Sequence, residues 1–176
     1  MRVQRSGTDG AGSHTLKIVR SRYDSPDSQR LIDELQAEYV WRYGGQDSTP
    51  VATGEFEPPN GLFLVGCEGG VPVAMGGWRR HDLETSGSVP GSSPAEIKRT
   101  YVSAQARGRG HARAILAELE QTARASGADW LVLETGQAQP EAIELYRTAG
   151  YVDIPAFGHY RHAPLAVHLG KPLTVS

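Results

Sequence analysis

The segment Gln105-Ala106-Arg107-Gly108-Arg109-Gly110 decides how this chain is read. It separates an apolar stretch that ends at Val102 from an amphipathic stretch that begins near Ala112. A helix N-terminus offers unpaired backbone N–H groups and a partial positive charge, and glycines let a ligand approach without a Cβ in the way. The segment therefore predicts a pyrophosphate site, and three arginines add positive charge around it: Arg107, Arg109 and Arg113.

Three kinds of phosphate-binding loop compete for this segment. A P-loop requires G-x-x-x-x-G-K-[ST], and the segment has no lysine followed by serine or threonine. A dinucleotide loop requires G-x-G-x-x-G, but Arg113 stands where the third glycine is needed for close packing. The third pattern, [QR]-x-x-G-x-[GA], binds the pyrophosphate of acyl-CoA, and Gln105, Gly108 and Gly110 match all its fixed positions.

On these residues the chain resembles the GCN5-related N-acetyltransferase (GNAT) superfamily. A second motif supports this, because residues 139–151 (QPEAIELYRTAGY) are similar to that superfamily's N-x-x-A-x-x-L-Y-x-x-x-G-[FY] segment. Gln139 stands where asparagine is usual, and Ala112 where a second glycine is more frequent. The specific motifs span about residues 95–151, and a looser likeness runs from residue 15 to the C-terminus.

Hydrophobic periodicity and turn residues around these motifs predict alternating strands and helices. Ser25-Pro26 and Gly44-Gly45 mark the two ends of the first helix. The order predicts an α/β (α+β) fold, and the resemblance implies a twisted mixed sheet flanked by helices, with splayed fourth and fifth strands at about 95–103 and 130–135. The expected strands are 15–22, 62–67, 71–78, 95–102, 130–133 and 165–169; the expected helices are 26–43, 112–125 and 140–149; and the expected loops are 46–60 and 81–94.

Length and composition limit the class of protein. The chain of 176 residues fits one domain, which we place at 15–176 after a flexible leader at 1–14. No apolar run reaches the roughly 18 residues of a membrane span, and a formal net charge of −2 predicts no nucleic-acid partner. Cys67 is the single cysteine, so an internal disulfide is excluded and a cytoplasmic location is expected. A homodimer is compatible with the sequence.

The resemblance assigns the cofactor contacts, with acetyl-CoA as co-substrate. It implies that the backbone of Val102 and Ser103 pairs with pantetheine, and that Gln139 keeps a polar contact with the CoA arm. The acceptor pocket would lie between residues 38–45 and 157–162. No metal is expected, because His159, His162 and His168 are not completed by a recognisable ligand set. The pyrophosphate would be held through the main-chain N–H groups of Arg107, Gly108, Arg109, Gly110, His111 and Ala112.

Acetyl transfer to an amine requires a neutral nucleophile. Deprotonating a lysine-like amine at neutral pH costs on the order of 4 to 5 kcal/mol, so a base is useful. By motif position Glu96 is the expected base, directly or through water, with a strand carboxylate paired to Lys98 or Arg99 as the equal alternative. A backbone N–H of the bulged fourth strand near Ser103 is expected to stabilise the oxyanion.

Tyr146 occupies the position of the superfamily's tyrosine acid. A phenol with a pKa near 10 can protonate a leaving thiolate whose conjugate acid has a pKa near 8.5. Without the motif, Tyr146 would be read as the aromatic member of a helix face with Ala142 and Ala149.

Together these residues predict an acetyl-CoA-dependent N-acetyltransferase that acts by direct transfer in a ternary complex. The acceptor is expected to be a primary amine, either a small molecule or a protein amino group. Two alternatives remain: a transferase for another acyl-CoA, and a CoA-binding sensor without turnover on the same fold.

Overall fold

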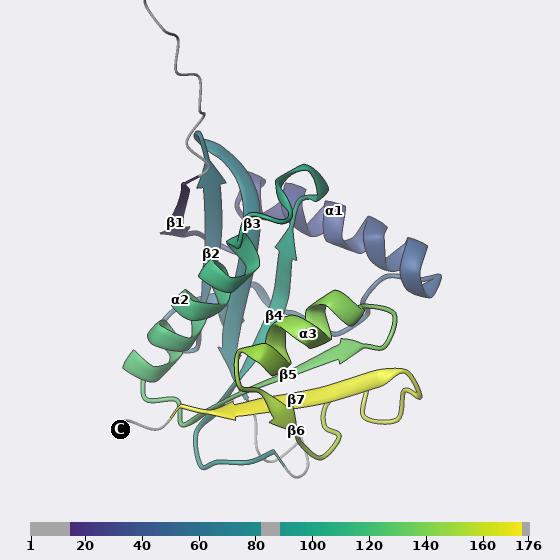
Figure 1. The fold of residues 1–176 in the computed structure, drawn as a ribbon. Coiled ribbons are helices and arrows are strands. Elements are labelled where there is room, and N and C mark those ends of the chain that lie inside the picture. The colour runs from purple at the N-terminus through teal and green to yellow at the C-terminus, as the bar shows by residue number, and fades with distance from the viewer. Residues whose placement is uncertain (1–14, 82–88, 174–176) are drawn as a thin grey trace, which may run out of the picture.

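The computed structural model describes residues 15–81 and 89–173, and its seven strands form one twisted sheet (Figure 1). Across the sheet the strands follow the order β1-β2-β3-β4-β5-β7-β6, and every neighbouring pair is antiparallel except β4 and β5. This mixed sheet confirms the expected fold class. The strands are β1 Leu16–Arg20, β2 Gly61–Glu68, β3 Val71–Arg80, β4 Pro94–Val102, β5 Trp130–Gly136, β6 Val152–Asp153 and β7 Ala166–Pro172.

Three α-helices cover both faces of the sheet. Helix α1 (Pro26–Tyr43) lies behind the sheet in Figure 1, whereas α2 (His111–Ala125) and α3 (Pro140–Thr148) lie in front of it. Each face has its own core: α1 packs on Phe56, Phe63 and Met75, and α2 packs on the opposite side of β2–β5. Both layers therefore converge on β4, which carries side chains of the site on each face.

The first helix begins and ends where the sequence predicts. Ser25 caps it by accepting a hydrogen bond from the Ser28 N–H at 3.2 Å, and Pro26 takes the first helical position. Gly44 ends the helix in the left-handed conformation, with φ +76°.

Other boundaries differ from the sequence-based expectations. The loop at 46–60 contains a short 3-10 helix, Thr53–Phe56, and another, Ala104–Ala106, follows β4. Strands β5 and β7 run three residues further than predicted, to Gly136 and Pro172, because they pair with each other along their whole length. Strand β6 was not predicted, since two exposed residues give no periodic signal. The expected leader and half of the expected 81–94 loop, residues 82–88, lie outside the described residues.

Strands β4 and β5 splay apart, as expected. They pair only through residues 94–96 of β4 and 130–132 of β5. Among the described strands, none pairs with residues 97–102 on the side that faces β5, so backbone polar groups on this edge are open to a ligand.

Strand β4 carries a bulge at Arg99. Between the pairs Gly77–Lys98 and Met75–Tyr101, β3 has one intervening residue and β4 has two. Arg99 adopts φ +60°, a conformation that is uncommon outside glycine. Successive strand side chains normally point to opposite faces, and the bulge breaks this alternation. As a result Lys98 and Arg99 both reach the same carboxylate, Asp47.

Candidate active site

Two cavities, each of about 410 Å³, meet where β4 and β5 splay. The glycine-loop cavity lies between the 106–113 segment and α3. The β4–β5 cavity lies between the two splayed strands, the end of α1 and residues 160–166. Both have the size of a small-molecule site. The residues that line both cavities are Thr100, Gln139, Ala142 and Tyr146.

The glycine-loop cavity fits a phosphate group. Gly108 and Gly110 have φ +77° and +79°, and a Cβ built on either would find no atom within 4 Å, so it would project into open space. No side chain caps the N-terminus of α2, which leaves the first-turn N–H groups of His111 and Ala112 for a ligand. These features are those required to hold the pyrophosphate of acyl-CoA.

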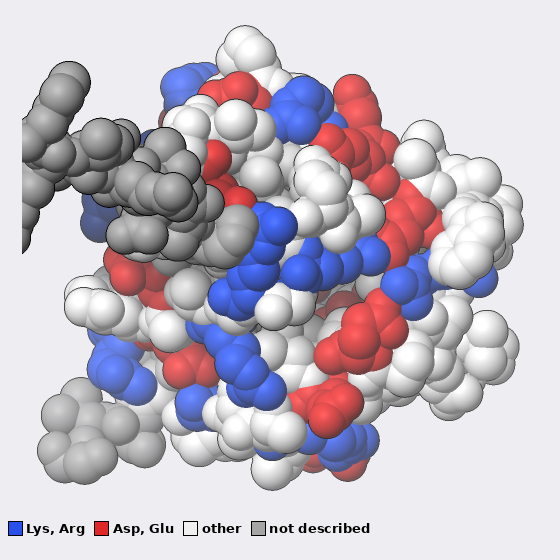
Figure 2. Space-filling model, turned by 45° about the horizontal axis from the view of Figure 1, so that its top comes forward, with Lys and Arg blue, Asp and Glu red and all other residues white. Residues whose placement is uncertain are grey.

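The arginines of this loop are paired with carboxylates. Arg107 contacts Glu38 at 2.6 Å, and Arg109 contacts Glu68, which also lies 2.6 Å from His111. Figure 2 shows that basic and acidic side chains are interspersed over the face of the molecule that it displays. The buried His111 imidazole therefore faces Glu68, and what it offers a ligand is its backbone N–H.

The backbone groups at the end of β4 already form hydrogen bonds within the chain. The Ser103 N–H donates to the Val73 carbonyl at 2.8 Å, and the Ser103 carbonyl accepts from the Ala106 N–H at 2.9 Å. The N–H is therefore already used and is not free to stabilise an oxyanion, whereas the carbonyl keeps a second lone pair that a ligand could use. The Val102 carbonyl accepts a hydrogen bond from Arg107 Nε at 2.9 Å, and the bulge lies at Arg99 rather than at Ser103.

Gln139 lies at the junction of the two cavities. Its Oε1 accepts from the Tyr43 hydroxyl at 3.1 Å, and Arg42 donates to the Ala138 carbonyl at 2.6 Å. These contacts fix the end of α1 against the β5–α3 loop. The amide of Gln139 is thus positioned beside both cavities, where a CoA arm would pass.

Tyr146 also lies at the junction. It is buried, it packs edge-on against Tyr151 at 5.5 Å, and it lines both cavities. Burial raises the pKa of its hydroxyl, against a smaller lowering effect of Thr100. The hydroxyl is therefore protonated throughout the physiological range and can act only as a proton donor.

Glu96 does not line either cavity, which argues against its expected role as base. Its Oε2 lies 3.3 Å from Arg79 Nε and 3.7 Å from His81 Nδ1. Its ion-pair partners are therefore these two residues, and not Lys98 or Arg99. Burial opposes ionisation, but His81, Lys98 and Arg79 together hold the Glu96 pKa below its usual range. A carboxylate stabilised in this way is a weak proton acceptor.

Glu134 on β5 lines the β4–β5 cavity, as does a second carboxyl group, that of Asp47. Burial raises the pKa of Glu134 to about 7, and Asp47 and Glu96 add to this while Lys98 opposes it. A carboxyl with a pKa near 7 is suited to general base catalysis at neutral pH. The sequence analysis missed it, although an acidic residue inside the apolar strand WLVLETG was a usable signal.

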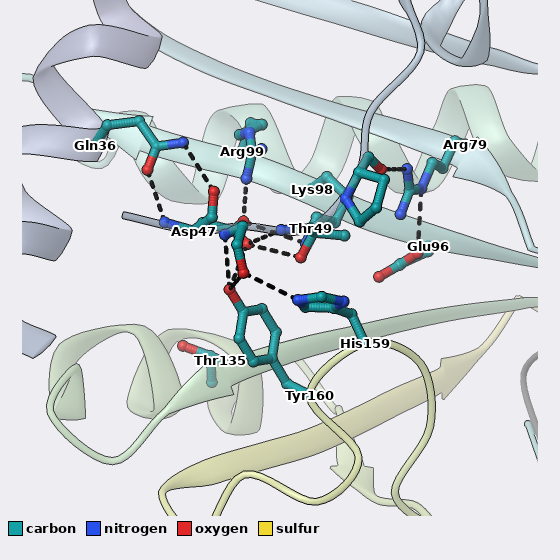
Figure 3. Close-up of polar contacts among 12 residues, drawn as sticks. Gln36, Asp47, Thr49, Arg79, Glu96, Lys98, Arg99, Thr135, His159 and Tyr160 are labelled. Atoms are coloured by element: carbon teal, nitrogen blue, oxygen red, sulfur yellow. Dashed lines mark hydrogen bonds and ion pairs between the residues drawn. The ribbon is translucent and has the colours of Figure 1, made fainter. Parts of the chain in front are cut away.

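Asp47 organises the opposite wall of this cavity (Figure 3). It forms ion pairs with Arg99 and with Lys98, the latter at 3.4 Å, and it accepts hydrogen bonds from Thr49 at 2.7 Å and from Tyr160 at 2.9 Å. Burial opposes its ionisation, but Lys98 and Arg99 hold the Asp47 pKa well below the usual range. Asp47 is therefore a fixed negative charge between two cations.

The sequence also suggests five aromatic residues for the acceptor pocket, and the structure divides them into two groups: Tyr39, Trp41, Tyr43, Trp78 and Tyr160. Tyr39, Tyr43 and Tyr160 line the β4–β5 cavity. Trp41 is 81% exposed on α1, and Trp78 is buried elsewhere, with its indole N–H bonded to Thr122 at 3.0 Å.

Comparison of the sequence with known protein families shows which family this chain belongs to. The profile of the Acetyltransferase (GNAT) family matches residues 28–151, which is more than half of the chain. The chain belongs to this family. An IAA acetyltransferase from Azospirillum brasilense is 33% identical over 144 residues, which cover 82% of this chain and 89% of that protein.

Solved structures agree with this GNAT assignment. A protein from Klebsiella pneumoniae, provisionally described as an acyl-CoA N-acyltransferase, superposes with a TM-score of 0.71 at 29% identity, covering 92% of this chain and 99% of that one. The GNAT domain of S. lividans PAT has the same fold, with a TM-score of 0.66 at 20% identity over 89% of this chain and 90% of that one. The resemblance seen in the sequence is confirmed, and acetyl-CoA is the co-substrate of this acyltransferase family.

Two further findings concern the described residues alone. None of the helices of this GNAT chain that the structure describes combines the length and apolar character of a membrane span. Within residues 15–81 and 89–173, no three His, Cys, Asp or Glu side chains are grouped so that they can hold a metal ion.

A substitution in the glycine loop tests the phosphate site. We expect Gly108→Asp to weaken CoA binding at least about tenfold, because a carboxylate would enter the cradle at the positive end of α2. Gly127→Asp is a matched control: Gly127 has φ +90°, no atom lies within 4 Å of its Cβ position, and it follows the other end of α2. Calorimetry with CoA distinguishes the two, and equal affinities in both variants would place the phosphates elsewhere.

Proposed function

We propose that this protein transfers the acetyl group of acetyl-CoA to a primary amine, directly and in a ternary complex. The observation that carries the proposal is the meeting of two cavities at Thr100 and Tyr146. The glycine-loop cavity suits the pyrophosphate, and the β4–β5 cavity has room and charge for a separate acceptor. Direct transfer requires both molecules to be bound at once with their reacting atoms adjacent.

In this mechanism the amine nitrogen attacks the thioester carbonyl carbon from the β4–β5 cavity. The N–C bond forms, the C–S bond breaks, and the electron pair of that bond leaves with sulfur as a thiolate. Tyr146 donates its proton to the thiolate. Glu134 accepts a proton from the amine, and free CoA and an N-acetyl amide are the products.

Glu134 and Tyr146 have the protonation states that these roles need. Near pH 7 the carboxyl of Glu134 is divided between its two forms, so a base is available without a strong preference for holding the proton. Tyr146 remains protonated because burial raises its pKa. A carboxyl and a phenol differ in pKa from the start, and burial, which raises both values, brings only the carboxyl of Glu134 close to neutral pH.

The acetyl group is supported by the family and by the IAA acetyltransferase of Azospirillum brasilense. A sensor without turnover has no use for a carboxyl with a pKa near 7 in the acceptor cavity. The retention of both Glu134 and Tyr146 at the site therefore favours an enzyme.

Binding and turnover test the proposal separately. We expect saturating acetyl-CoA to raise the Tm by roughly 5 to 10 °C, since a ligand at 100 times its Kd contributes about 2.7 kcal/mol to a domain of this size. We expect release of free thiol when a panel of primary amines is added. Absence of any CoA binding at millimolar ligand would refute the proposal, and tight binding without turnover on any amine would favour the sensor.

A further inference from the structure

The wall of the β4–β5 cavity formed by β4 carries two buried cations. Lys98 and Arg99 are both buried, and the bulge at Arg99 turns their side chains toward the same carboxylate, Asp47. Regular strand geometry would have sent one of the two to the other face. The bulge thus concentrates positive charge at one place on the cavity wall.

One negative charge faces these two positive charges. Asp47 is the carboxylate that contacts them, and Tyr160 and Thr49 contribute only hydroxyl groups. Within the described residues, Lys98 Nζ makes two hydrogen bonds for its three donors, at 3.4 Å to Asp47 and 3.2 Å to Thr49. Because a buried charge is costly unless it is fully paired, this wall is suited to receive one further anion.

The opposite wall has the opposite character. Glu134 on β5 is the fourth charged residue among those that line this cavity, beside Asp47, Lys98 and Arg99. Its carboxyl is the group that takes the acceptor's proton in the proposed function. An acceptor that lies across the cavity would therefore place its amine toward β5 and its other end toward β4.

The mouth of the cavity is crossed by contacts between two loops. Ser48 donates its N–H to the Tyr160 hydroxyl at 2.9 Å, and its side chain lies 3.0 Å from His159 Nε2 (Figure 3). With the Tyr160–Asp47 hydrogen bond, these contacts join residues 47–48 to residues 159–160 over the site. A cavity of about 410 Å³ whose lining loops are joined in this way has the size of a small-molecule site.

We propose that the acceptor is a small amine that carries a carboxylate, of the amino-acid class, with its carboxylate bound by Lys98 and Arg99 and its amine directed at Glu134. This inference rests on the proposed function and names its substrate class. A carboxylate fits better than a phosphate, because Asp47 offsets one of the two cations on the β4 wall and Glu134 adds negative charge on the β5 wall, so at most a single positive charge remains for the ligand. Arginine and lysine donors give carboxylates strong charge-assisted hydrogen bonds.

The test uses sets of three amines that share a side chain: an amino acid, its carboxamide and the decarboxylated amine. For sets built on alanine, leucine and phenylalanine, we expect kcat/KM of at least one amino acid to exceed that of its carboxamide about 100-fold or more, and O-phosphoethanolamine to be a poor acceptor. Equal rates for acid and amide would overturn the inference, as would a preference for the phosphate-bearing amine. If no amine in any set is acetylated, the proposed function itself fails, so the two failures are distinguishable.

A variant of the subsite locates the recognition. We expect Lys98→Met to raise KM for the preferred amino acid about 10-fold to 100-fold while leaving KM for its carboxamide almost unchanged. The amide corrects for any effect of Lys98 on Glu134, because both acceptors use the same base. Lys171→Met is the matched control, since Lys171 pairs with Glu120 outside both cavities. An equal loss for acid and amide would show a structural role for Lys98 and overturn the assignment.

Calorimetric titration of the preferred amino acid into each folded variant, in the presence of CoA, adds a readout that does not depend on turnover. We expect its Kd to be weakened in Lys98→Met and unchanged in Lys171→Met. Unchanged affinity in Lys98→Met would contradict the carboxylate subsite.

Discussion

We expect Glu134→Gln to lower kcat about 10²-fold to 10⁴-fold at pH 8, which is the typical range for removal of a general base. The amide keeps the shape of the side chain but cannot accept the amine's proton. Because Glu134 has a pKa of about 7, wild-type kcat/KM should rise about tenfold per pH unit below pH 7 and level off above it. The variant should not show this rise of kcat/KM with pH. Steady-state kinetics between pH 5.5 and 9 measure both effects.

The same substitution makes an independent prediction about stability. The pKa of Glu134 is raised from an ordinary value of 4.5 to about 7, so the folded state binds its proton more tightly than the unfolded state. Its contribution to stability is fully present below about pH 4.5 and is lost as the pH rises to 7. Glu134→Gln should therefore gain Tm relative to wild type between pH 4.5 and pH 8, as thermal melts at both values would show.

Glu96→Gln is the control for the choice of base. Its removal takes the carboxylate from His81 and one of two carboxylates from Arg79, which keeps Glu55, so the variant should be less stable. The folded fraction should keep most of its kcat and its pH profile. If instead Glu96→Gln abolishes the rise of kcat/KM below pH 7 and Glu134→Gln retains it, the base is Glu96 and the mechanism given above is wrong.

The fold could be predicted because its determinants are local. Ser25, Pro26 and Gly44 set the ends of α1 through a cap, a fixed φ and a left-handed residue. The glycine loop and the 139–151 segment have fixed spacing, so they identified the family and predicted which residues contact the cofactor. The prediction that β4 and β5 splay apart came from that resemblance. The residues of these two segments predicted only that each forms a strand.

The acceptor side could not be predicted because it depends on contacts between distant segments. Asp47 lies in a loop, and it meets Lys98, Arg99 and Tyr160 only in the folded sheet. The bulge at Arg99 leaves no mark in the sequence, since a strand with one extra residue shows the same composition. The choice of Glu96 as base from the sequence met the same limit: position on a strand does not reveal whether Arg79 is within reach of the carboxylate.

Tyr146→Phe should lower kcat about 100-fold with little change in CoA affinity, because it removes the proton donor and keeps the ring packing. The effect lies at the low end for a general acid, since water in the cavity can also protonate a thiolate. Tyr151→Phe is the matched control: Tyr151 is buried, packs against Tyr146 at 5.5 Å and lines neither cavity. It should keep wild-type kcat.

Rapid-mixing kinetics decide whether the loss in Tyr146→Phe belongs to the chemical step. The pre-steady-state rate of thiol release should fall by the same factor as kcat, whereas Kd for CoA from calorimetry should stay within about twofold. The deficit should also shrink when the leaving thiol is made more acidic, because a thiolate of lower pKa needs less help from a donor. A Tyr146→Phe enzyme that releases thiol at the wild-type rate from acetyl-CoA would reduce Tyr146 to a packing residue between α3 and the sheet.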